Sequence, residues 1–408
     1  MTASAPSPRI LVVGAGQSGA ALCAKLRALG HRGALTLIGA EPHAPYQRPP
    51  LSKAYLKGDM DRERLHLRPP SFYAAEGITL MTGAEVVAID PAARLVRLAE
   101  GAALAYDLLA LTTGAEPRRL AGAIGGGLDG VLTMRDIADA DALAARLAPG
   151  LSALIVGGGY VGLEAAAALA TAGLGVIVLE QAPRILARVA APATSDYFRA
   201  LHTAHGVGIR EASNLLRLTG ETAVTGADLA DGTHLPADLV LVGIGVAPRD
   251  ALAREAGLAT GDGIIVDASG RTSDPSIFAA GDCARFPHDG GSIRLESVPH
   301  AIEHAETVAA AMLGHEAHYT AKPWFWSDQY DVKLQIAGLN TGYERTITRP
   351  GARPGSQSVW YFAGPRLLAI DAMNDPRAYM TAKRWIEAGA SPDAEALADP
   401  ATDLRSLA

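Results

Sequence analysis

The chain has 408 residues and a net charge of −7 at pH 7, with 49% hydrophobic and 19% charged residues. This composition is typical of a globular protein with several domains. It excludes global disorder and argues against attraction of the whole chain to nucleic acid or to an anionic membrane. Only two cysteines occur, Cys23 and Cys283, so neither a disulfide framework nor a zinc ribbon is expected. The first residues hold no apolar signal segment, and the longest apolar stretch, 165–179, is shorter than a membrane span. We therefore expect a cytoplasmic protein with no membrane or nucleic-acid partner.

The N-terminal segment has the order strand, glycine-rich turn, helix, strand. The apolar run Arg9–Val13 leads directly into the sequence GAGQSG, and an Ala/Leu-rich stretch then precedes a second apolar run, Ala34–Gly39. This order and length are those of a βαβ unit that binds a dinucleotide. In such a unit Gly14 allows a tight turn, Gly16 allows close approach of the pyrophosphate, and Gly19 allows close helix–strand packing.

The same order recurs in the middle of the chain. The segment Leu151–Glu180 contains a strand, the sequence GGGYVG, an Ala-rich helix and another strand, and Gly157, Gly159 and Gly162 repeat the first motif. This internal repeat predicts two doubly wound α/β domains with parallel sheets. Two dinucleotide sites in one chain suggest a bound flavin dinucleotide and a diffusible nicotinamide dinucleotide.

An acidic residue follows each glycine motif at a distance where it can hydrogen-bond a ribose. Glu41 lies 22 residues after the third glycine of the first motif, and Glu180 lies 18 residues after that of the second. An acid in the second unit favours a free 2′-hydroxyl, and therefore NADH over NADPH. Arg184 and Arg188 follow closely and leave three alternatives: contact with the pyrophosphate, acceptance of a 2′-phosphate, or a place on a solvated loop.

The other segments fall between and after these two units. The Pro-rich stretch Glu41–Pro70 is predicted to be an extended loop. From about residue 322, alternating strands and turns followed by a helix near Asp375–Gly389 predict an antiparallel sheet with a helix, which is an α+β domain. Three further segments each predict a buried strand that runs into a turn: Tyr106–Gly114, Leu239–Pro248 and Thr272–Ala284.

Together these segments resemble the FAD-dependent pyridine nucleotide–disulfide reductase superfamily. Within it, the chain is similar to the NADH-dependent ferredoxin reductases that serve bacterial Rieske dioxygenases and haem monooxygenases. The resemblance covers essentially the whole chain and is carried by VVGAGQSG, PYQRPPLSKAYL, LTTGAEPR, IVGGGYVGLEAA, VGIGVAPR, TSDPSIFAAGDCARF, RLESVPHA and PWFWSDQYDVKLQIAGL. The PPLSK and WFWSDQ segments are the specific ones.

The resemblance implies an α/β fold of the glutathione reductase type, with two Rossmann-like nucleotide-binding domains and a C-terminal α+β domain. The FAD-binding domain would comprise 1–115 and 246–321, the NAD-binding domain 116–245, and the α+β domain 322–408. The molecule would be a monomer or a weak homodimer.

The resemblance also implies contacts with FAD. Lys53 would lie beside the isoalloxazine, Asp282 would hydrogen-bond the ribitol chain, and Trp326 would lie against the ring. Family members often carry an acid at the position of Ala40, one residue before Glu41, so the ribose partner stays open. The expected FAD contacts are Gly14, Ala15, Gly16, Ser18, Gly19, Glu41, Arg48, Lys53, Val86, Thr113, Gly114, Arg135, Gly281, Asp282, Val298 and Trp326.

Lys53 and Glu164 are the expected catalytic residues. In the family, a glutamate after GYVG pairs with the lysine of the PPLSK loop. A cation near flavin N5 would stabilise the anionic reduced ring and help to hold nicotinamide C4 close to N5. The alternatives are a surface lysine near a helix start and a first-turn acid that is favoured by the helix dipole. The expected NAD contacts are Gly157, Gly159, Tyr160, Val161, Gly162, Glu164, Glu180, Arg188 and Gly245.

The positions of the cysteines distinguish this chain from its relatives. Disulfide reductases and peroxide-reducing members carry redox cysteines near the region that here reads PYQRPPLSKAYL, which has none. Cys23 and Cys283 are expected to be buried packing residues. Electrons would therefore pass from the flavin to an external one-electron acceptor.

The activity implied is NADH:ferredoxin oxidoreduction, with FAD and NADH as cofactors. NADH would give a hydride to flavin N5, and two single electrons would then pass to an acidic, transiently bound [2Fe–2S] ferredoxin. That ferredoxin would supply a terminal oxygenase of aromatic hydrocarbon catabolism. The alternatives are a rubredoxin reductase, a quinone or monodehydroascorbate-type reductase, and an NADH-sensing flavoprotein of the apoptosis-inducing-factor type.

Two features of the C-terminal region bear on the partner. The cluster Trp324–Trp326 could cap the flavin, anchor a partner, or begin a hydrophobic core. Between Lys333 and Arg384 there are eight basic residues and three acidic ones. Such a basic face could steer an acidic ferredoxin, or it could be an ordinary solvated surface.

A metal site is not expected. His300 and His304 have the i,i+4 spacing of zinc ligands, but no second Cys/His pair with ligand spacing accompanies them. Glu303 and Glu306 suggest that this helix face is exposed.

Overall fold

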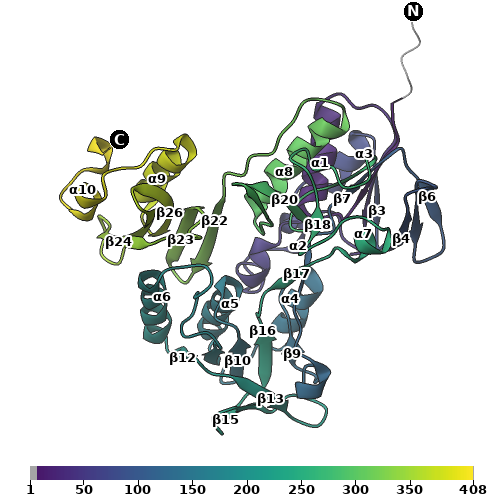
Figure 1. Ribbon diagram of the computed structural model, residues 1–408. Helices are drawn as coiled ribbons and strands as arrows, with labels where there is room; N and C mark the ends of the chain where they lie inside the picture. Colours follow the sequence, from purple (N-terminus) through teal and green to yellow (C-terminus); the bar gives the residue numbers. More distant parts are fainter. Residues whose placement is uncertain (1–6, 408) are drawn as a thin grey trace, which may run out of the picture. The chain divides into compact units, whose positions relative to one another are not determined.

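The computed structural model describes residues 7–407, and the contacts within it divide the chain into two compact units (Figure 1). The first unit comprises Met1–Gln47, Arg62–Glu116 and Val246–Ala321, and the second comprises Arg48–Asp61, Pro117–Gly245 and Lys322–Ala408. The short segment Arg48–Asp61 therefore lies with the second unit, although the sequence suggested that it was part of the FAD-binding region. The division into three domains stays a prediction.

A five-stranded parallel sheet, with the order β19-β7-β1-β2-β3, forms the centre of the first unit. Every residue of β1 is buried because both faces of the sheet are covered. Ile10 and Val12 pack in a cluster with residues of α1 and α8, and Leu11 and Val13 pack in a cluster with residues of the smaller sheets of this unit. Helix α1 packs against helix α8. The bounds are β1 Ile10–Val13, α1 Gln17–Ala28, β2 Leu35–Gly39, β3 Ile78–Thr82, β7 Leu108–Leu111, β19 Ile277–Ala279 and α8 Val298–Met312.

Smaller elements complete the first unit. Two three-stranded sheets have the orders β4-β5-β6 and β18-β20-β21, and β8 pairs with β17. Their bounds are β4 Val86–Asp90, β5 Leu95–Leu98, β6 Ala103–Ala105, β8 Ala115–Pro117, β17 Val246–Pro248, β18 Ile264–Ile265, β20 Ala284–His288 and β21 Gly291–Ile293. The short helices are α2 Arg62–Leu65, α3 Pro70–Ala75 and α7 Ala251–Glu255.

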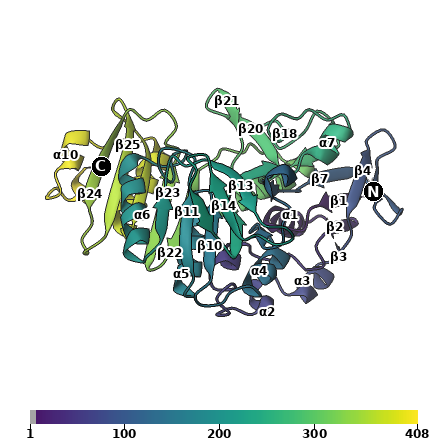
Figure 2. The same cartoon turned by 90° about the horizontal axis from the view of Figure 1, so that it is seen from below.

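A second five-stranded parallel sheet, with the order β12-β11-β10-β16-β9, forms the centre of the second unit. Figure 2 shows helix α5 beside strands β10 and β11. The bounds are η1 Pro49–Ser52, η2 Gly122–Ile124, β9 Val131–Leu132, α4 Ile137–Ala144, β10 Ser152–Val156, α5 Tyr160–Thr171, β11 Gly175–Leu179, α6 Pro192–Ala204, β12 Gly208–Arg210 and β16 Leu239–Val242. A three-stranded antiparallel sheet adds β13 Leu215–Thr219, β14 Gly226–Leu229 and β15 His234–Pro236.

The same unit contains the antiparallel sheet β22-β23-β26-β25-β24, which confirms the α+β character predicted for the C-terminal region. Helix α9 begins after Asp375, whose side chain caps it by accepting from Ala378 N, and ends at Gly389 in the left-handed conformation. The bounds are β22 Trp324–Gln329, β23 Val332–Gly338, β24 Arg345–Pro350, β25 Gln357–Ala363, β26 Arg366–Met373, α9 Pro376–Ala388, α10 Ala394–Ala398 and η3 Leu404–Ser406.

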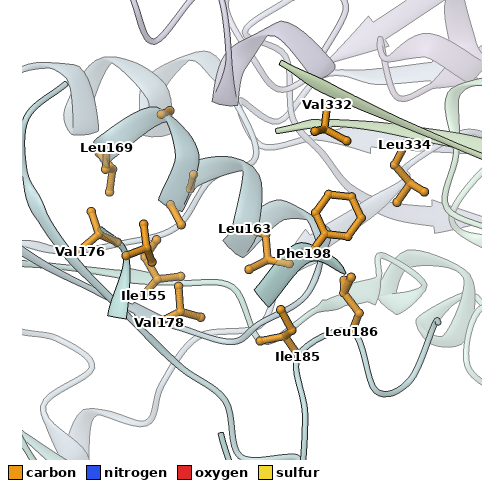
Figure 3. Packing of buried hydrophobic residues seen from close by; sticks show 14 of the residues in the cluster. Ile155, Leu163, Leu169, Val176, Val178, Ile185, Leu186, Phe198, Val332 and Leu334 are labelled. Atoms are coloured by element: carbon orange, nitrogen blue, oxygen red, sulfur yellow. The ribbon is translucent and has the colours of Figure 1, made fainter. Parts of the chain in front are cut away.

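One hydrophobic core joins the two five-stranded sheets of the second unit (Figure 3). Ile155 and Leu163, from the nucleotide-type βαβ element, belong to the same buried cluster as Phe198 of α6 and Val332 and Leu334 of β23. The apolar residues by which the sequence predicts this βαβ element therefore also pack against the C-terminal sheet.

Two predictions about local structure are wrong. The stretch Glu41–Pro70 is not a simple extended loop, because it contains η1 and α2 as well as a β-bridge between Tyr46 and His66. The helix face that carries His300 and His304 is buried, and the two histidines pack with Phe286 and Tyr319. In the part of the chain that the structure describes, no helix is both long and apolar enough to cross a membrane.

Candidate nucleotide and redox site

The first glycine turn leaves an open surface at the start of α1. Gly14 has φ +113° and lies so close to β7 that a Cβ there would be 2.2 Å from Thr112 O. Gly16 is the N-cap of α1, and nothing lies within 4 Å of a Cβ built on it. The free N–H groups of a helix start next to open space suit a phosphate group.

A buried hydroxyl faces the same turn. Ser18 Oγ has no hydrogen-bond partner among the described residues, although the side chain is only 7% exposed. It lies 3.0 Å from the position of a Cβ on Gly281, the glycine that follows β19 with φ +78°. A buried polar group without a partner is rare unless a ligand satisfies it. The residues present therefore fit the FAD that was predicted for this unit.

The predicted FAD contacts are divided between the two units. The Glu41 carboxylate accepts a hydrogen bond from Tyr46, and Thr113 Oγ1 donates to Arg249 O at 2.6 Å, so both side chains have protein partners. Contacts of the first unit are Gly14, Ala15, Gly16, Ser18, Gly19, Glu41, Val86, Thr113, Gly114, Gly281, Asp282 and Val298. Those of the second unit are Arg48, Lys53, Arg135 and Trp326.

Arg48 and Arg135 are brought together within the second unit. Arg48 Nη1 donates to Arg135 O at 2.8 Å, which joins segments that are 87 residues apart in the sequence. The turn is held further by Asp139, which accepts from Arg135 N at 2.8 Å. The two arginines that were predicted as FAD contacts are therefore neighbours.

The second glycine turn repeats the geometry of the first. Gly157 has φ +112°, and a Cβ there would lie 2.4 Å from Gly243 O, whereas a Cβ on Gly159 would meet nothing within 4 Å. The hydroxyl of Tyr160 is buried without a described partner, and its ring centroid lies 5.0 Å from that of Phe325. Burial raises the pKa of Tyr160 well above its ordinary value, so the phenol is neutral. The open space at Gly159 fits a second nucleotide here.

Glu180 is fixed at this turn. Its carboxylate accepts hydrogen bonds from Gly158 N and Ala182 N, each at 2.7 Å. Arg184 points elsewhere, because it donates to Ser195 Oγ at 2.5 Å and to Ala187 O at 3.3 Å. Arg184 and Arg188 were left with three alternative roles. The contacts of Arg184 with Ser195 and Ala187 do not favour the role in which it binds a 2′-phosphate.

Arg188 lies near Gly245. A Cβ on Gly245 would be 3.5 Å from the Arg188 guanidinium, and this glycine has φ +95°. The two residues were predicted separately as NAD contacts and are neighbours in the structure. Val161, the last of the predicted set, is 48% exposed at the start of α5.

Lys53 and Glu164 form an ion pair within the second unit. Lys53 Nζ donates to Glu164 Oε2 at 2.7 Å, and the two side chains are 21% and 7% exposed. Lys53 also donates to Pro49 O at 3.3 Å. The ammonium therefore has a protein partner, and the first turn of α5 contains no acidic residue. The catalytic role of the pair stays a prediction.

Two serines that sequence reasoning missed complete the surroundings of Glu164. Ser52 Oγ donates to Glu164 Oε2 at 3.0 Å, and Ser327 Oγ donates to Glu164 Oε1 at 2.8 Å. A buried carboxylate is costly unless several donors satisfy it, and here three do. The signal was present in the sequence, since each serine is the small polar residue inside one of the two specific segments, PPLSK and WFWSDQ.

The two cysteines are thiols in the core, as predicted. Both have 0% exposure, and burial raises the pKa of each. A buried, protonated thiol is a poor nucleophile and a poor redox centre.

The basic segment between Lys333 and Arg384 is partly neutralised. Arg345 pairs with Glu395 at 2.9 Å, and Arg377 pairs with Asp403, so acids outside the segment balance charges within it. Arg349 is buried and donates to backbone carbonyls of the C-terminal segment, among them Leu397 O at 2.8 Å. Lys333, Arg353 and Arg384 are exposed.

The chain belongs to the pyridine nucleotide-disulphide oxidoreductase family, whose pattern matches residues 8–305, and residues 324–408 match the reductase C-terminal family. It is therefore an oxidoreductase that uses FAD and a nicotinamide dinucleotide. A ferredoxin–NAD(P)(+) reductase of Sphingomonas sp is 44% identical over 387 residues, which are 93% of each chain. A rubredoxin–NAD(+) reductase of Pseudomonas putida is 37% identical over 90% of this chain and 96% of its own.

A solved structure gives the same picture of the fold. The crystal structure of the covalent putidaredoxin reductase–putidaredoxin complex contains a chain that matches with a TM-score of 0.94 and 39% identity, covering 98% of each chain. The predicted combination of two Rossmann-like regions and a C-terminal antiparallel sheet is confirmed.

Proposed function

We propose that this chain is an NADH:ferredoxin oxidoreductase. The observation that carries the proposal is the Lys53–Glu164 pair, in a chain that has two open glycine turns and no exposed thiol. The arrangement suits hydride transfer to a flavin followed by delivery of electrons to an external acceptor. The named activity of the Sphingomonas relative supports a ferredoxin as that acceptor.

Residues of the first glycine turn bind FAD in this proposal, and the Lys53–Glu164 pair acts on its ring. The N-terminus of α1 and the space at Gly16 bind the FAD pyrophosphate, and Ser18 donates its unsatisfied hydroxyl to the same group. Bound FAD supplies the redox chemistry, because flavins accept a hydride and give up electrons one at a time. Lys53 places a positive charge beside the ring, and Glu164 keeps that ammonium in one position.

The second glycine turn selects the nicotinamide dinucleotide. Glu180 stands at the turn with its carboxylate fixed by two backbone N–H groups, so a 2′-phosphate there would meet a negative charge. The guanidinium of Arg184 donates to Ser195 and Ala187, so these N–H groups are already engaged within the protein. We therefore assign NADH as the donor, with Arg188 near its phosphates.

The acceptor is a small acidic [2Fe–2S] ferredoxin that feeds a terminal oxygenase of aromatic hydrocarbon catabolism. Exposed Lys333, Arg353 and Arg384 offer positive charge for a transient encounter. The protein acts in the cytoplasm, where NADH is supplied and where two unpaired thiols persist.

A panel of acceptors tests this function. The purified protein is supplied with saturating NADH and, in separate assays, with a [2Fe–2S] ferredoxin of an oxygenase system, a rubredoxin, a quinone and monodehydroascorbate. We expect kcat/KM for the ferredoxin to exceed that for every other acceptor by at least about tenfold, and NADPH to support less than about a tenth of the rate. A higher kcat/KM for rubredoxin would assign the chain to the alternative that the Pseudomonas putida relative represents.

A further inference from the structure

Strand β22 presents two buried polar side chains on one face. Ser327 and Gln329 are two residues apart, so their side chains point the same way, and both have 0% exposure. Asp328, between them, points to the other face and is partly exposed. Buried polar groups on a strand need partners, and these two find them on α5 and α6.

The partners form one chain of hydrogen bonds that ends at Glu164. His202 Nε2 lies 2.8 Å from Gln329 Oε1, and Gln329 Nε2 lies 3.2 Å from Ser327 Oγ. Ser327 Oγ in turn lies 2.8 Å from Glu164 Oε1. The chain therefore joins α6, β22 and α5, and Lys53 meets the other oxygen of the same carboxylate.

The chemistry of the groups fixes the direction of every bond. An ionised carboxylate only accepts, so the Ser327 hydroxyl donates to it and receives the N–H of Gln329. The amide oxygen of Gln329 then faces His202, whose Nε2 carries a proton. Burial lowers the pKa of His202, so the ring is neutral and has the Nε2–H tautomer. All donors point toward Glu164.

We propose that Ser327, Gln329 and His202 are positioning residues that fix the Glu164 carboxylate and, through it, the ammonium of Lys53. The inference rests on the proposed function, which gives this ion pair its part in hydride transfer. The chain from β22 fixes the carboxylate oxygen that Lys53 does not use. Without it the carboxylate can rotate, and a shift of about 1 Å at a reacting centre is enough to slow a reaction by orders of magnitude.

Ser327→Ala tests the role with the least change of volume. We expect the variant to fold and retain FAD, the Kd for NADH to stay within about twofold, and the rate constant of flavin reduction to fall about tenfold. Ser358→Ala is the matched control, because Ser358 is equally buried on β25 of the same sheet but accepts its hydrogen bond from Trp360 Nε1 at 3.0 Å. An equal loss in both variants would overturn the proposal.

A double-mutant cycle tests whether Ser327 acts through Glu164. In the Glu164→Gln background, adding Ser327→Ala should change neither the rate constant of flavin reduction nor the midpoint potential of the bound flavin. If Ser327→Ala lowers the rate constant by the same factor and shifts the midpoint potential equally in the wild-type and Glu164→Gln backgrounds, Ser327 does not act through Glu164.

Nitrogen-15 NMR of the histidine side chains tests the chain without any turnover. We expect the Nε2–H tautomer for His202 in the wild type and a loss of that preference in Gln329→Leu, with His202→Gln identifying the resonance. A wild-type Nδ1–H tautomer would overturn the hydrogen-bond chain. If NADH fails to reduce the flavin at all, the proposed function fails, while the midpoint potentials and the tautomer still decide whether the positioning chain exists.

Discussion

At the scale of single residues, charge and close packing carry the chemistry. In the proposed function the Lys53 ammonium brings a full positive charge to the flavin ring, and the buried carboxylate of Glu164 holds it in place. The glycine turns contribute space rather than charge. Gly16 and Gly159 have no side chain, so a nucleotide can approach the backbone there. Substitutions at these residues should therefore separate binding of the cofactor from transfer of the hydride.

Lys53→Met removes the charge and keeps most of the side-chain stem. We expect FAD to stay bound and the rate constant of flavin reduction by NADH to fall by roughly 100-fold, because a fixed charge at a developing anion contributes about that much. Anaerobic stopped-flow absorbance measures this. Lys57→Met, on an exposed lysine of the same segment, is the control. A loss of less than about threefold would remove Lys53 from the mechanism.

Gly16→Ala places a methyl group in the space assigned to the pyrophosphate. Because nothing in the protein lies within 4 Å of that methyl position, the fold should be unaffected and FAD content should fall severalfold. Gly122→Ala is the control, since a Cβ on Gly122 also meets nothing within 4 Å and this glycine lies on the other compact unit. Full FAD occupancy in Gly16→Ala would contradict the assignment of the first turn.

At the scale of elements, the joint between α6 and the C-terminal sheet contains a buried acid. Asp371 of β26 is 1% exposed and accepts from Thr194 of α6 at 2.7 Å and from Tyr361 of β25. The Tyr361 hydroxyl itself accepts from Ala191 N at 2.9 Å. Burial raises the pKa of Asp371 to about 6, although both hydroxyl donors act to lower it.

This acid makes the stability of the second unit depend on pH. Because folding raises the pKa above the ordinary 3.8, the folded state holds the proton more tightly. The stabilisation is complete below pH 3.8 and is lost as the pH rises through about 6. Relative to Asp371→Asn, which lacks this ionisation, the wild type should gain roughly 1–1.5 kcal/mol of unfolding free energy between pH 7.5 and pH 5. Denaturant unfolding of both proteins at the two pH values measures these free energies. If the difference in unfolding free energy between the wild type and Asp371→Asn is the same at both pH values, Asp371 does not titrate in this range.

The elements also show how far the sequence predicts this molecule. Both βαβ units, the strands at 108–111 and 277–279, and helix α9 with its cap at Asp375 follow from local patterns of apolar residues, glycine and capping groups. The contacts of Ser327, Gln329 and His202 do not, because they join segments that only tertiary packing brings together. The histidines of α8 were predicted to be exposed because Glu303 and Glu306 lie nearby, but Glu303 is exposed and Glu306 half-buried while both histidines are buried.

At the scale of the whole molecule, the balance of charge governs the encounter with an acidic partner. The chain carries −7 overall, and several of the basic residues between 333 and 384 are paired with acids or buried. Attraction of a ferredoxin therefore depends on the few exposed cations that remain. We expect a rise in ionic strength from about 0.01 M to about 0.15 M to slow ferredoxin reduction severalfold.

The flavin reduction step provides the control for this salt effect. At saturating NADH the rate of that step should change by less than about twofold over the same range, because no protein encounter is involved. A ferredoxin rate that is independent of salt would exclude electrostatic steering and leave docking to apolar contacts such as those of Trp324 and Trp326.

An anaerobic single-turnover experiment on the purified protein tests whether it passes electrons from NADH through a flavin to a ferredoxin. The protein is first mixed with one equivalent of NADH and then with oxidised [2Fe–2S] ferredoxin, each molecule of which accepts one electron. The absorbance of the flavin and of the iron–sulfur centre is followed throughout. We expect NADH to bleach the flavin rapidly and the flavin absorbance to return fully as two equivalents of ferredoxin are reduced. A protein that holds no flavin, or a flavin that NADH does not bleach, would show that the chain is not an NADH-dependent flavoprotein reductase.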